Sequence, residues 1–337
     1  MGGTGGRDGG AAVRLRPGLR VARRGPCEVQ VGVDPRWAVR VRGLSGAQAD
    51  RLLADGGRSL DGGLPPPVLD RLDQAGLLRG PARRTRRAVP ALQPEVVAHG
   101  LVRADGDGHA VLHRRAGATV RVEGLDAVGV TVARVLAASG VGRLRVVDES
   151  AVRAEDVGAG LADVGTPRAA ALTAALARWA PRVRVVGADA SDPPDVAVTV
   201  ARDAVDPAQV LALAAADVPH LPVAVREADA LVGPFTGGAV GIGAACLRCL
   251  DLHRAAADPA WPAVLAQLVA RRRPPVAGPT AVLACVVGGL VAAEVLAHLD
   301  GDRPRTVGGQ YVVPVPDAVP RLDRWPVHPD CGCTGLG

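Results

Sequence analysis

Two close pairs of cysteines stand far apart in the sequence, Cys246-Leu-Arg-Cys249 and Cys331-Gly-Cys333. Each pair can present two thiolates to one cation from a turn, and the two pairs together complete a tetrahedral shell. Four sulfur ligands leave no open position for a substrate, so they predict a structural zinc ion. Such a site would staple the C-terminal segment back onto the rest of the fold. Free or disulfide-paired thiols are the alternative, and His328 could substitute for one cysteine.

A second stretch has the spacing of a nucleotide-binding turn. A short strand over Thr119–Val122 leads to a turn flanked by Gly124 and Gly129, and an apolar helix follows over Val130–Ala138. Such a turn aims backbone N–H groups and a positive helix end at a phosphate. Asp148, about twenty residues beyond the turn, is placed to accept a hydrogen bond from a ribose hydroxyl.

Asp126 weakens this nucleotide site. It stands where a strict G-x-G-x-x-G pattern has its middle glycine. Its side chain would crowd a phosphate, and its negative charge would repel one. We therefore expect the fold of a nucleotide-binding domain with a weak or inactive nucleotide site.

The elements that must position these residues alternate between strand and helix. Apolar strands over Val183–Val186, Val196–Val200 and Pro222–Val225 follow the central unit, with helical runs between them. This alternation predicts an α/β fold with a Rossmann-like, mostly parallel sheet covered on both faces. Functional side chains are then expected at the carboxyl ends of the strands, near Gly124, Asp148 and Arg202-Asp203.

The N-terminal part has a different pattern, which predicts a small winged-helix-like domain over residues 18–80. Two short strands come first, over Val29–Val33 and Trp37–Val41. Two helices follow, over Ala47–Ala54 and Pro65–Leu78, and Ser45 could cap the first of them. A domain of this kind can bind nucleic acid, capture a peptide by strand addition along a sheet edge, or serve as an accessory with neither role. Self-association into a homodimer is a further alternative.

Composition sets the remaining boundaries. Residues 1–17 are glycine-rich and predict a disordered tail, residues 81–95 are an arginine- and proline-rich linker, and residues 96–337 form the nucleotide-binding-fold domain with the zinc site. Met1–Gly10 lacks the apolar core of a secretory signal, so we expect a cytoplasmic protein. Ala281–Leu299 is apolar but contains Glu294 and His298, which favours a buried core helix over a membrane span.

The charge pattern disfavours nucleic-acid binding. The net charge is +6, and all 40 basic residues are arginines interspersed with 34 acidic residues. No repeated aromatic platform accompanies them, because one Phe and one Tyr stand beside four Trp. The arginines therefore indicate a compositional bias more than a nucleic-acid surface.

The order of these motifs over roughly residues 100–337 resembles ThiF-type proteins, which are relatives of the ubiquitin-activating enzymes. The matching stretches are the glycine turn, Ser139-Gly-Val-Gly142, Val146-Val-Asp148, Asp163-Val-Gly165, Cys246-x-x-Cys249, Gly289–Gly301 and the final cysteine pair. The resemblance implies binding of ATP and Mg²⁺ and adenylation of the C-terminal carboxylate of a small ubiquitin-like protein. It also places a phosphate-binding basic residue at Arg168, where the family has lysine.

Further stretches look closer to one branch, the ThiF-like cyclodehydratase partner proteins of azole- and azoline-modified peptide clusters. They are Val232-Gly-Pro-Phe235, Cys249-Leu-Asp-Leu-His253, Asp258–Trp261 and His328-Pro-Asp-Cys-Gly-Cys333. This similarity implies an N-terminal domain that binds the leader of a precursor peptide, and a YcaO-type modifying enzyme as partner.

The sequence also departs from the family. The phosphate-contacting Asn and Arg of the family fall near Asp156 and Ala159, and the metal-binding aspartate would be Asp203, beside Arg202. Losing phosphate-directed cations removes transition-state stabilisation, so we favour a catalytically degenerate scaffold. The alternatives are an active ATP-dependent adenylyltransferase and, less favoured, a dehydrogenase with NAD ribose on Asp148, so the sequence leaves open whether the chain is an enzyme.

Overall fold

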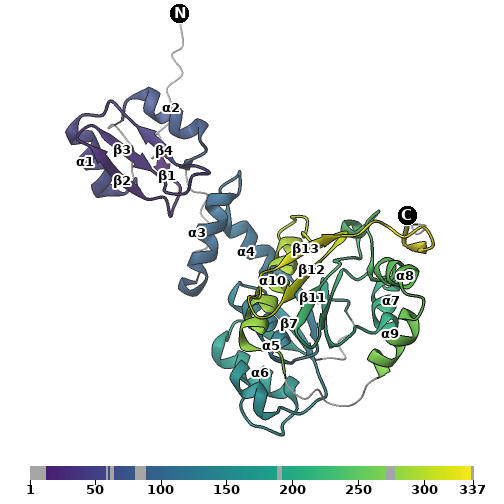
Figure 1. Ribbon diagram of the computed structural model, residues 1–337. Coiled ribbons are helices and arrows are strands. Elements are labelled where there is room, and N and C mark those ends of the chain that lie inside the picture. The colour runs from purple at the N-terminus through teal and green to yellow at the C-terminus, as the bar shows by residue number, and fades with distance from the viewer. Residues whose placement is uncertain are drawn as a thin grey trace, which may run out of the picture. The chain divides into compact units, whose positions relative to one another are not determined.

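The computed structural model describes residues 13–57, 60, 64–79, 89–187, 192–270 and 278–334 (Figure 1). The chain divides into two compact units, Met1–Leu112 and His113–Gly337. The sequence predicts that the second domain begins at residue 96, whereas the structure groups residues 96–112 with the N-terminal unit. Residues 81–88 of the predicted linker and residues 1–12 of the predicted tail lie outside the described residues.

The N-terminal unit combines small antiparallel sheets with helices. Strands β2, β3 and β4 form a three-stranded sheet in that order, and β1 pairs with β5. The elements are β1 Arg14–Leu15, β2 Val21–Gly25, β3 Glu28–Val31, β4 Val39–Val41, α1 Gly46–Asp55, α2 Pro66–Gln74, β5 Leu78–Arg79, α3 Gln93–Val102 and α4 Gly108–Gly117, the last crossing the unit boundary.

The structure confirms the strand pair and both helices of this region with altered ends. Ser45 caps α1 by accepting a hydrogen bond from the Gln48 amide, while the Gln48 side chain accepts from the Ser45 amide. The second helix ends at Gln74 and not at Leu78, because Gly76 follows in the left-handed conformation with φ of 67°. Leu78 then enters a short strand.

Residues assigned to the tail and linker prove to be structured where the structure describes them. Leu15, inside the predicted tail, is buried in β1. Arg16 donates hydrogen bonds to the carbonyls of Arg103 (2.7 Å) and Ala104 (2.8 Å), just beyond the last turn of α3. A cation at a helix C-terminus satisfies free carbonyls and opposes the helix dipole. Arg16 therefore ties α3, which begins inside the predicted linker, to the N-terminal unit.

The C-terminal unit is built on one eight-stranded sheet in the order β13-β12-β11-β10-β9-β6-β7-β8. Strands β8, β7, β6, β9 and β10 run parallel to one another. The pairs β10–β11, β11–β12 and β12–β13 are antiparallel. The strands are β6 Thr119–Glu123, β7 Arg143–Val147, β8 Arg184–Val186, β9 Val196–Arg202, β10 His220–Val225, β11 Asp229–Val232, β12 Gly309–Pro314 and β13 Arg321–Arg324. This topology confirms the predicted α/β, Rossmann-like, mostly parallel sheet.

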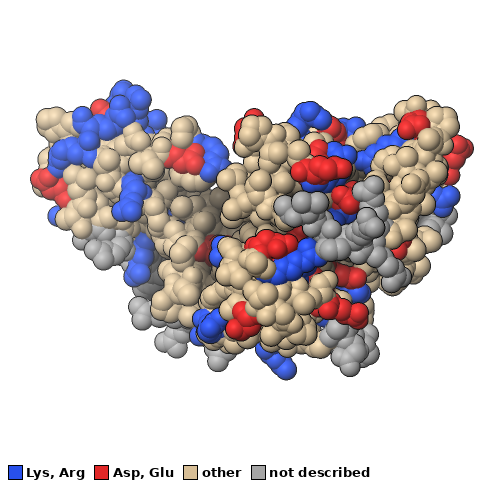
Figure 2. Space-filling view, turned by 60° about the horizontal axis from the view of Figure 1, so that its bottom comes forward, with Lys and Arg blue, Asp and Glu red and all other residues tan. Residues whose placement is uncertain are grey.

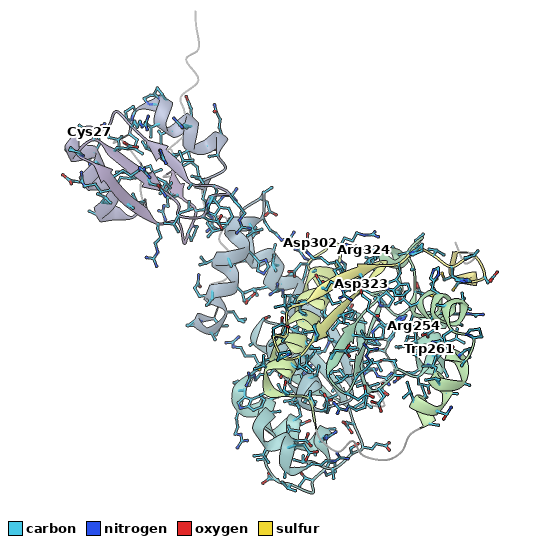
Figure 3. The ribbon with its side chains drawn as sticks, in the orientation of Figure 1. Cys27, Arg254, Trp261, Asp302, Asp323 and Arg324 are labelled. Atoms are coloured by element: carbon cyan, nitrogen blue, oxygen red, sulfur yellow. The ribbon has the colours of Figure 1, made fainter. Side chains whose placement is uncertain are left out.

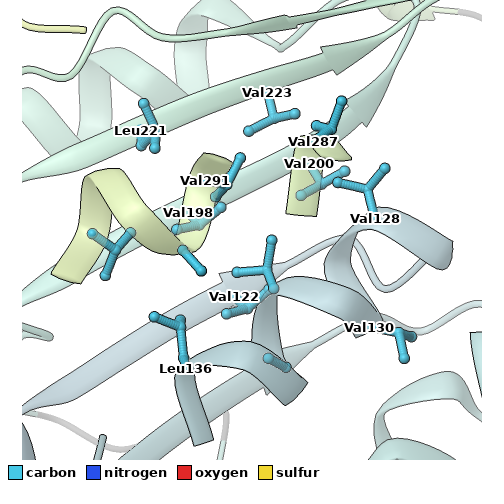
Figure 4. Close-up of a cluster of buried hydrophobic side chains, with 14 of the residues drawn as sticks. Val122, Val128, Val130, Leu136, Val198, Val200, Leu221, Val223, Val287 and Val291 are labelled. Carbon is cyan, nitrogen blue, oxygen red and sulfur yellow. The ribbon is translucent and has the colours of Figure 1, made fainter. Parts of the chain in front are cut away.

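Helices pack on both faces of this sheet. They are α5 Ala127–Ala138, α6 Arg168–Trp179, α7 Pro207–Ala215, α8 Leu247–Ala257, α9 Trp261–Ala270 and α10 Ala281–Leu299. The main core lies where α5 and α10 meet one face of the sheet, with Val122, Leu136 and Val291 among its members (Figure 4). Among the described residues, α10 alone is long and apolar enough to cross a membrane, and it lies here against α5 with eight buried residues.

A buried ion pair joins the end of α10 to α4. Arg115 and Asp300 are 2% and 4% exposed, and the guanidinium donates two hydrogen bonds to the carboxylate, at 2.9 and 2.7 Å. Arg115 also donates to the carbonyl of Ser139 at the end of α5. The pair therefore fixes three helix ends, and neither partner can be hydrated if the other is lost.

Replacing Asp300 by alanine should lower the free energy of unfolding by about 3–5 kcal/mol, because it leaves the Arg115 charge buried without its counter-ion. The measurement is urea unfolding followed by circular dichroism. Glu227→Ala, which removes an exposed carboxylate from the turn between β10 and β11, is the matched control and should change stability by less than about 0.5 kcal/mol. Equal stabilities of the two variants would contradict the role given to the pair.

Candidate functional site

The predicted nucleotide-binding residues converge on the carboxyl ends of β6, β7 and β9. The turn from β6 into α5 carries Gly124 and Gly129, β7 leads into Asp148, and β9 ends at Arg202. Open parallel sheets bind ligands at this edge because the helix N-termini and the strand-end loops meet there. Arg168 is the first residue of α6, and its side chain reaches the same place.

Close packing alone accounts for both glycines of the turn. A Cβ atom on Gly124 would lie 2.0 Å from the carbonyl oxygen of Val200, and Gly124 has a φ of 82°. A Cβ atom on Gly129 would lie 1.9 Å from the carbonyl oxygen of Gly124. Any side chain would therefore force α5 away from the sheet. Gly124 and Gly129 are therefore required by the tight junction between β6 and α5, whether or not a phosphate binds there.

Asp126 occupies the helix N-terminus that a phosphate would use. Its Oδ1 accepts hydrogen bonds from the amides of Val128 (2.9 Å) and Gly129 (3.3 Å), which makes it the N-cap of α5. The helix therefore begins at Ala127, three residues before the predicted start. Burial raises the pKa of Asp126, against the opposing effects of these amides and of Arg202. The sequence pattern identified Asp126 as an obstacle but missed that it replaces the ligand.

Asp148 is also engaged with the protein backbone. Its Oδ2 accepts a hydrogen bond from the Leu125 amide at 2.7 Å, and its Oδ1 accepts one from the Ser150 amide at 2.8 Å. The side chain is only 8% exposed. Asp148 thus ties the glycine turn to the end of β7, and each of its oxygens already has one donor before any ribose arrives.

Arg168 is bound to carboxylates of its own chain. Its Nε and Nη2 donate to the two oxygens of Asp156 at 2.8 and 3.0 Å, and its Nη1 lies 3.6 Å from Asp148. Burial opposes the charge on Arg168, but its hydrogen bonds with Asp156 raise its pKa on balance. A second cation, Arg202, has its Nη1 4.0 Å from the Oδ2 of Asp126.

Three carboxylates and two guanidinium groups therefore share this edge of the sheet, and two of the carboxylates, Asp156 and Asp148, lie against Arg168. A triphosphate would need Arg168 to leave a bidentate carboxylate pair, and would need the α5 amides to lose their cap. Arg202 was noted in the sequence only as a neighbour of Asp203. The sequence contained no signal for its contact with Asp126, because that contact depends on how β9 lies beside β6.

The four predicted metal ligands form one cluster. The Sγ atoms of Cys246, Cys249, Cys331 and Cys333 all lie within 4.8 Å of one another. Three of the separations, Cys246–Cys249, Cys246–Cys331 and Cys249–Cys333, are 3.8, 3.6 and 3.5 Å. Bonds of about 2.3 Å from four sulfurs to one tetrahedral ion require separations near 3.8 Å. This donor set could hold a soft or borderline metal ion.

Burial disfavours the ionised form of two of these thiols, Cys246 and Cys333. Burial raises the pKa of Cys246 to about 11, and the charges of Cys249 and Cys331 add to the effect. Burial also raises the pKa of Cys333 well above its ordinary value. For Cys249, hydrogen bonds with the backbone of His328 and Cys246 outweigh burial and lower the pKa. Thiolates are the metal-binding form, so a bound cation would supply the charge that this buried site lacks.

The surroundings of the cluster anchor it to the sheet. The Nη1 of Arg254 donates to Asp251 at 3.1 Å and its Nη2 donates to Gln310 of β12 at 2.9 Å. Its guanidinium also lies over the ring of Trp261, which is labelled beside it in Figure 3. The guanidinium lies over the ring of Trp325 as well. His328, the predicted substitute ligand, packs edge-on against His253 with the ring centroids 4.7 Å apart. Among the described residues the cluster consists of cysteines alone.

The fold and this site define an α/β protein with a mostly parallel sheet and a cluster of four cysteines that could hold a metal ion. The ThiF family model matches residues 107–316, more than half of the chain, so the chain belongs to the ThiF family. No curated protein sequence matches it.

Solved structures of two proteins, MccB and PaaA, share its fold. E. coli MccB with AMPCPP and SeMet MccA is 15% identical with a TM-score of 0.70, over 96% of this chain and 99% of that chain. E. coli MccB with succinimide is 14% identical with a TM-score of 0.69, over 97% and 100%. SeMet PaaA is 14% identical with a TM-score of 0.64, over 91% and 98%. At these identities the likeness establishes the fold, here over nearly the whole chain.

Replacing Cys249 by serine should release the bound metal and lower the melting temperature, because Cys249 is fully buried and a hydroxyl is a poor substitute for a thiolate. The measurement is metal content by inductively coupled plasma mass spectrometry beside thermal unfolding. Cys285→Ser, which changes an exposed thiol on α10, is the control and should keep the metal. Metal-free wild-type protein, purified without chelator, would rule out the site.

Proposed function

We propose that this chain is a catalytically degenerate ThiF-family scaffold. It binds a precursor peptide through its N-terminal unit and presents that peptide to a separate modifying enzyme of the YcaO type. The product class is a ribosomally made, modified peptide, and the setting is the cytoplasm. The carboxylate of Asp126 on the first amides of α5 is the observation that carries the loss of catalysis.

The charges around this cap support the same conclusion. Adenylation develops negative charge on the phosphates, which an enzyme must stabilise with cations and amides aimed at them. Here the amides of Val128 and Gly129 already have an acceptor, and Arg168 already holds Asp156. Gly124, Gly129, Asp148 and Arg168 therefore maintain the fold of a nucleotide site without its usual ligand.

The N-terminal unit supplies the peptide-binding role. Its three-stranded sheet has the order β2-β3-β4, so within the described part of the unit β2 and β4 each pair on one side only and leave backbone groups for another strand. Residues Met1–Leu112 contain 18 arginines against 11 acidic residues, whereas the rest of the chain contains 22 against 23. Figure 2 shows patches of arginine on this unit, mainly along its upper edge in that view. An acidic leader would be attracted to it.

An active adenylyltransferase is the second candidate. The favouring observation is that the fold matches E. coli MccB structures over both units, including forms with ATP and with the peptide MccA. In that case ATP and Mg²⁺ would bind at the strand ends, with Asp148 on the ribose and Arg168 released to the phosphates.

The metal of the four-cysteine cluster is, in this proposal, a structural zinc ion held by Cys246, Cys249, Cys331 and Cys333. Zinc favours four-coordinate tetrahedral thiolate sites and has no redox chemistry of its own. Its place in the fold, between the start of α8 and the segment after β13, suits a structural role.

Wild-type protein should show no ATP–pyrophosphate exchange with a candidate peptide, and Asp126→Gly should bind ATP at least about tenfold more tightly than wild type. The substitution frees two amides and restores the G-x-G-x-x-G pattern, while glycine costs only a few tenths of a kcal/mol at an N-cap. Calorimetric titration with ATP and Mg²⁺ measures the affinity. Asp126→Asn, which keeps the cap, is the control and should gain no binding. Robust exchange by wild type that Asp148→Ala abolishes would establish adenylation instead.

A labelled leader peptide from the same gene cluster should bind the full chain with micromolar affinity, about −8 kcal/mol, and more weakly as salt rises. Arg40→Glu, on the exposed face of β4, should weaken binding about three- to tenfold because it reverses one charge beside the sheet edge. Fluorescence anisotropy measures the affinity. Arg303→Glu, an exposed arginine of the other unit, should leave it unchanged. Equal losses in both variants would argue against the N-terminal unit as the binding site.

A further inference from the structure

Helix α9, Trp261–Ala270, is apolar along its whole length and yet has no buried residue. Apart from the indole of Trp261, its only polar side chain is Gln267, whose Nε2 donates back to the carbonyl of Ala263 at 3.0 Å. None of its side chains belongs to an apolar cluster of the described residues. The other strongly apolar helix, α10, has eight buried residues. Helix α9 is therefore an apolar helix that lies outside the core.

The surface around α9 also lacks charge. Helix α8 packs against both α9 and α7, and Figure 1 shows the three helices together on one side of the C-terminal unit. Neither α7 nor α9 contains a charged residue, although 22% of the chain is charged. Val264 of α9 is 40% exposed and Leu211 of α7 is 64% exposed. A single exposed apolar residue is ordinary, but two uncharged helices beside each other form a candidate contact surface.

Polar contacts hold the start of α9 in place of core burial. The Nε1 of Trp261 donates to Asp251 of α8 at 3.2 Å, and the guanidinium of Arg254 lies over the indole ring (Figure 3). Arg254 in turn donates to Gln310 of β12. The helix is thus fixed to α8 and to the sheet before any partner arrives, so that little conformational entropy is lost when it is covered.

The absence of charge restricts what can cover α9. Burying a charge without a partner is costly, so the opposing surface must itself be uncharged and apolar. A second copy of this chain meets that condition, because each copy carries the same uncharged helix. Across a two-fold axis the two α9 helices can run antiparallel, and their dipoles then attract each other. A strongly acidic or basic partner has no complementary group on α9.

We infer that α9 is the centre of a two-fold contact between two copies of this chain. A helix of ten residues is about 15 Å long, so the contact buries less than the roughly 1,200 Å² of a stable interface. The association is therefore weak, with a dissociation constant of about 10–100 µM. The net charge of +6 opposes it at long range, so added salt strengthens it. This inference does not depend on the proposed function.

The test is sedimentation equilibrium of the full chain from about 2 to 200 µM, a range that brackets this affinity. Wild type should approach the mass of a dimer as concentration rises, and should do so at lower concentration in higher salt. Val264→Arg places two like charges in the contact, so it should weaken association at least about tenfold. Val319→Arg changes a valine that is 61% exposed in the β12–β13 connection, and this matched control should associate as wild type does.

Mixing two variants tests the symmetry of the contact. Val264→Glu should also be monomeric alone, whereas an equal mixture with Val264→Arg should recover association, because opposite charges then meet across the axis. A monomeric wild type, equal association of Val264→Arg and wild type, association that weakens with salt, or a mixture that stays monomeric would each overturn the inference. A monomeric wild type that binds the YcaO-type enzyme of the same gene cluster, but not after Val264→Arg, would assign α9 to that enzyme instead. Val264→Arg should leave the leader titration unchanged, so failure here and failure of the proposed function remain distinguishable.

Discussion

The two hydrogen bonds that Asp126 accepts from the amides of Val128 and Gly129 fix the turn from β6 into α5, around which the charged groups at this edge of the sheet are arranged. A helix N-terminus offers its free amides to one acceptor at a time, so a built-in carboxylate and an incoming phosphate compete for the same donors. Asp148 holds the other side of the same turn through the Leu125 amide. The backbone amides of the turn thereby have acceptors from the protein itself. The two nearby arginines also face carboxylates, with Arg168 bonded to Asp156 and Arg202 near Asp126.

The two units differ in the way they carry charge. The excess of arginine lies in the N-terminal unit, whereas the C-terminal unit is close to neutral. Within the C-terminal unit, charged groups are paired at the carboxyl ends of the strands, where Arg168 holds Asp156 and Arg202 lies near Asp126. Long-range attraction for an acidic partner would therefore act mainly on the first unit.

Local patterns in the sequence were sufficient to predict the sheet, the helix pairs and the four-cysteine cluster. Hydrophobic periodicity and C-x-x-C spacing can be recognised within a few residues of one another. They were insufficient for Arg16, whose contact with α3 joins residues more than eighty positions apart and makes residues 96–112 part of the first unit. The same limit applied to Asp126. Its residue type predicted a conflict with phosphate, but only the backbone geometry of the turn shows the carboxylate folded back onto the helix. Gly124 and Gly129 were located correctly, yet their close contacts explain them without a nucleotide.

The four-cysteine cluster also affects the order in which the chain can fold during synthesis. Cys246 and Cys331 are 85 positions apart, so the ribosome makes one half of the donor set well before the other. Until the second pair emerges, α8 carries two thiols with no partners, and α10 and β12 must find their places without the closing contact. Closure of the four-cysteine cluster then comes as a late step that joins the C-terminal segment to α8.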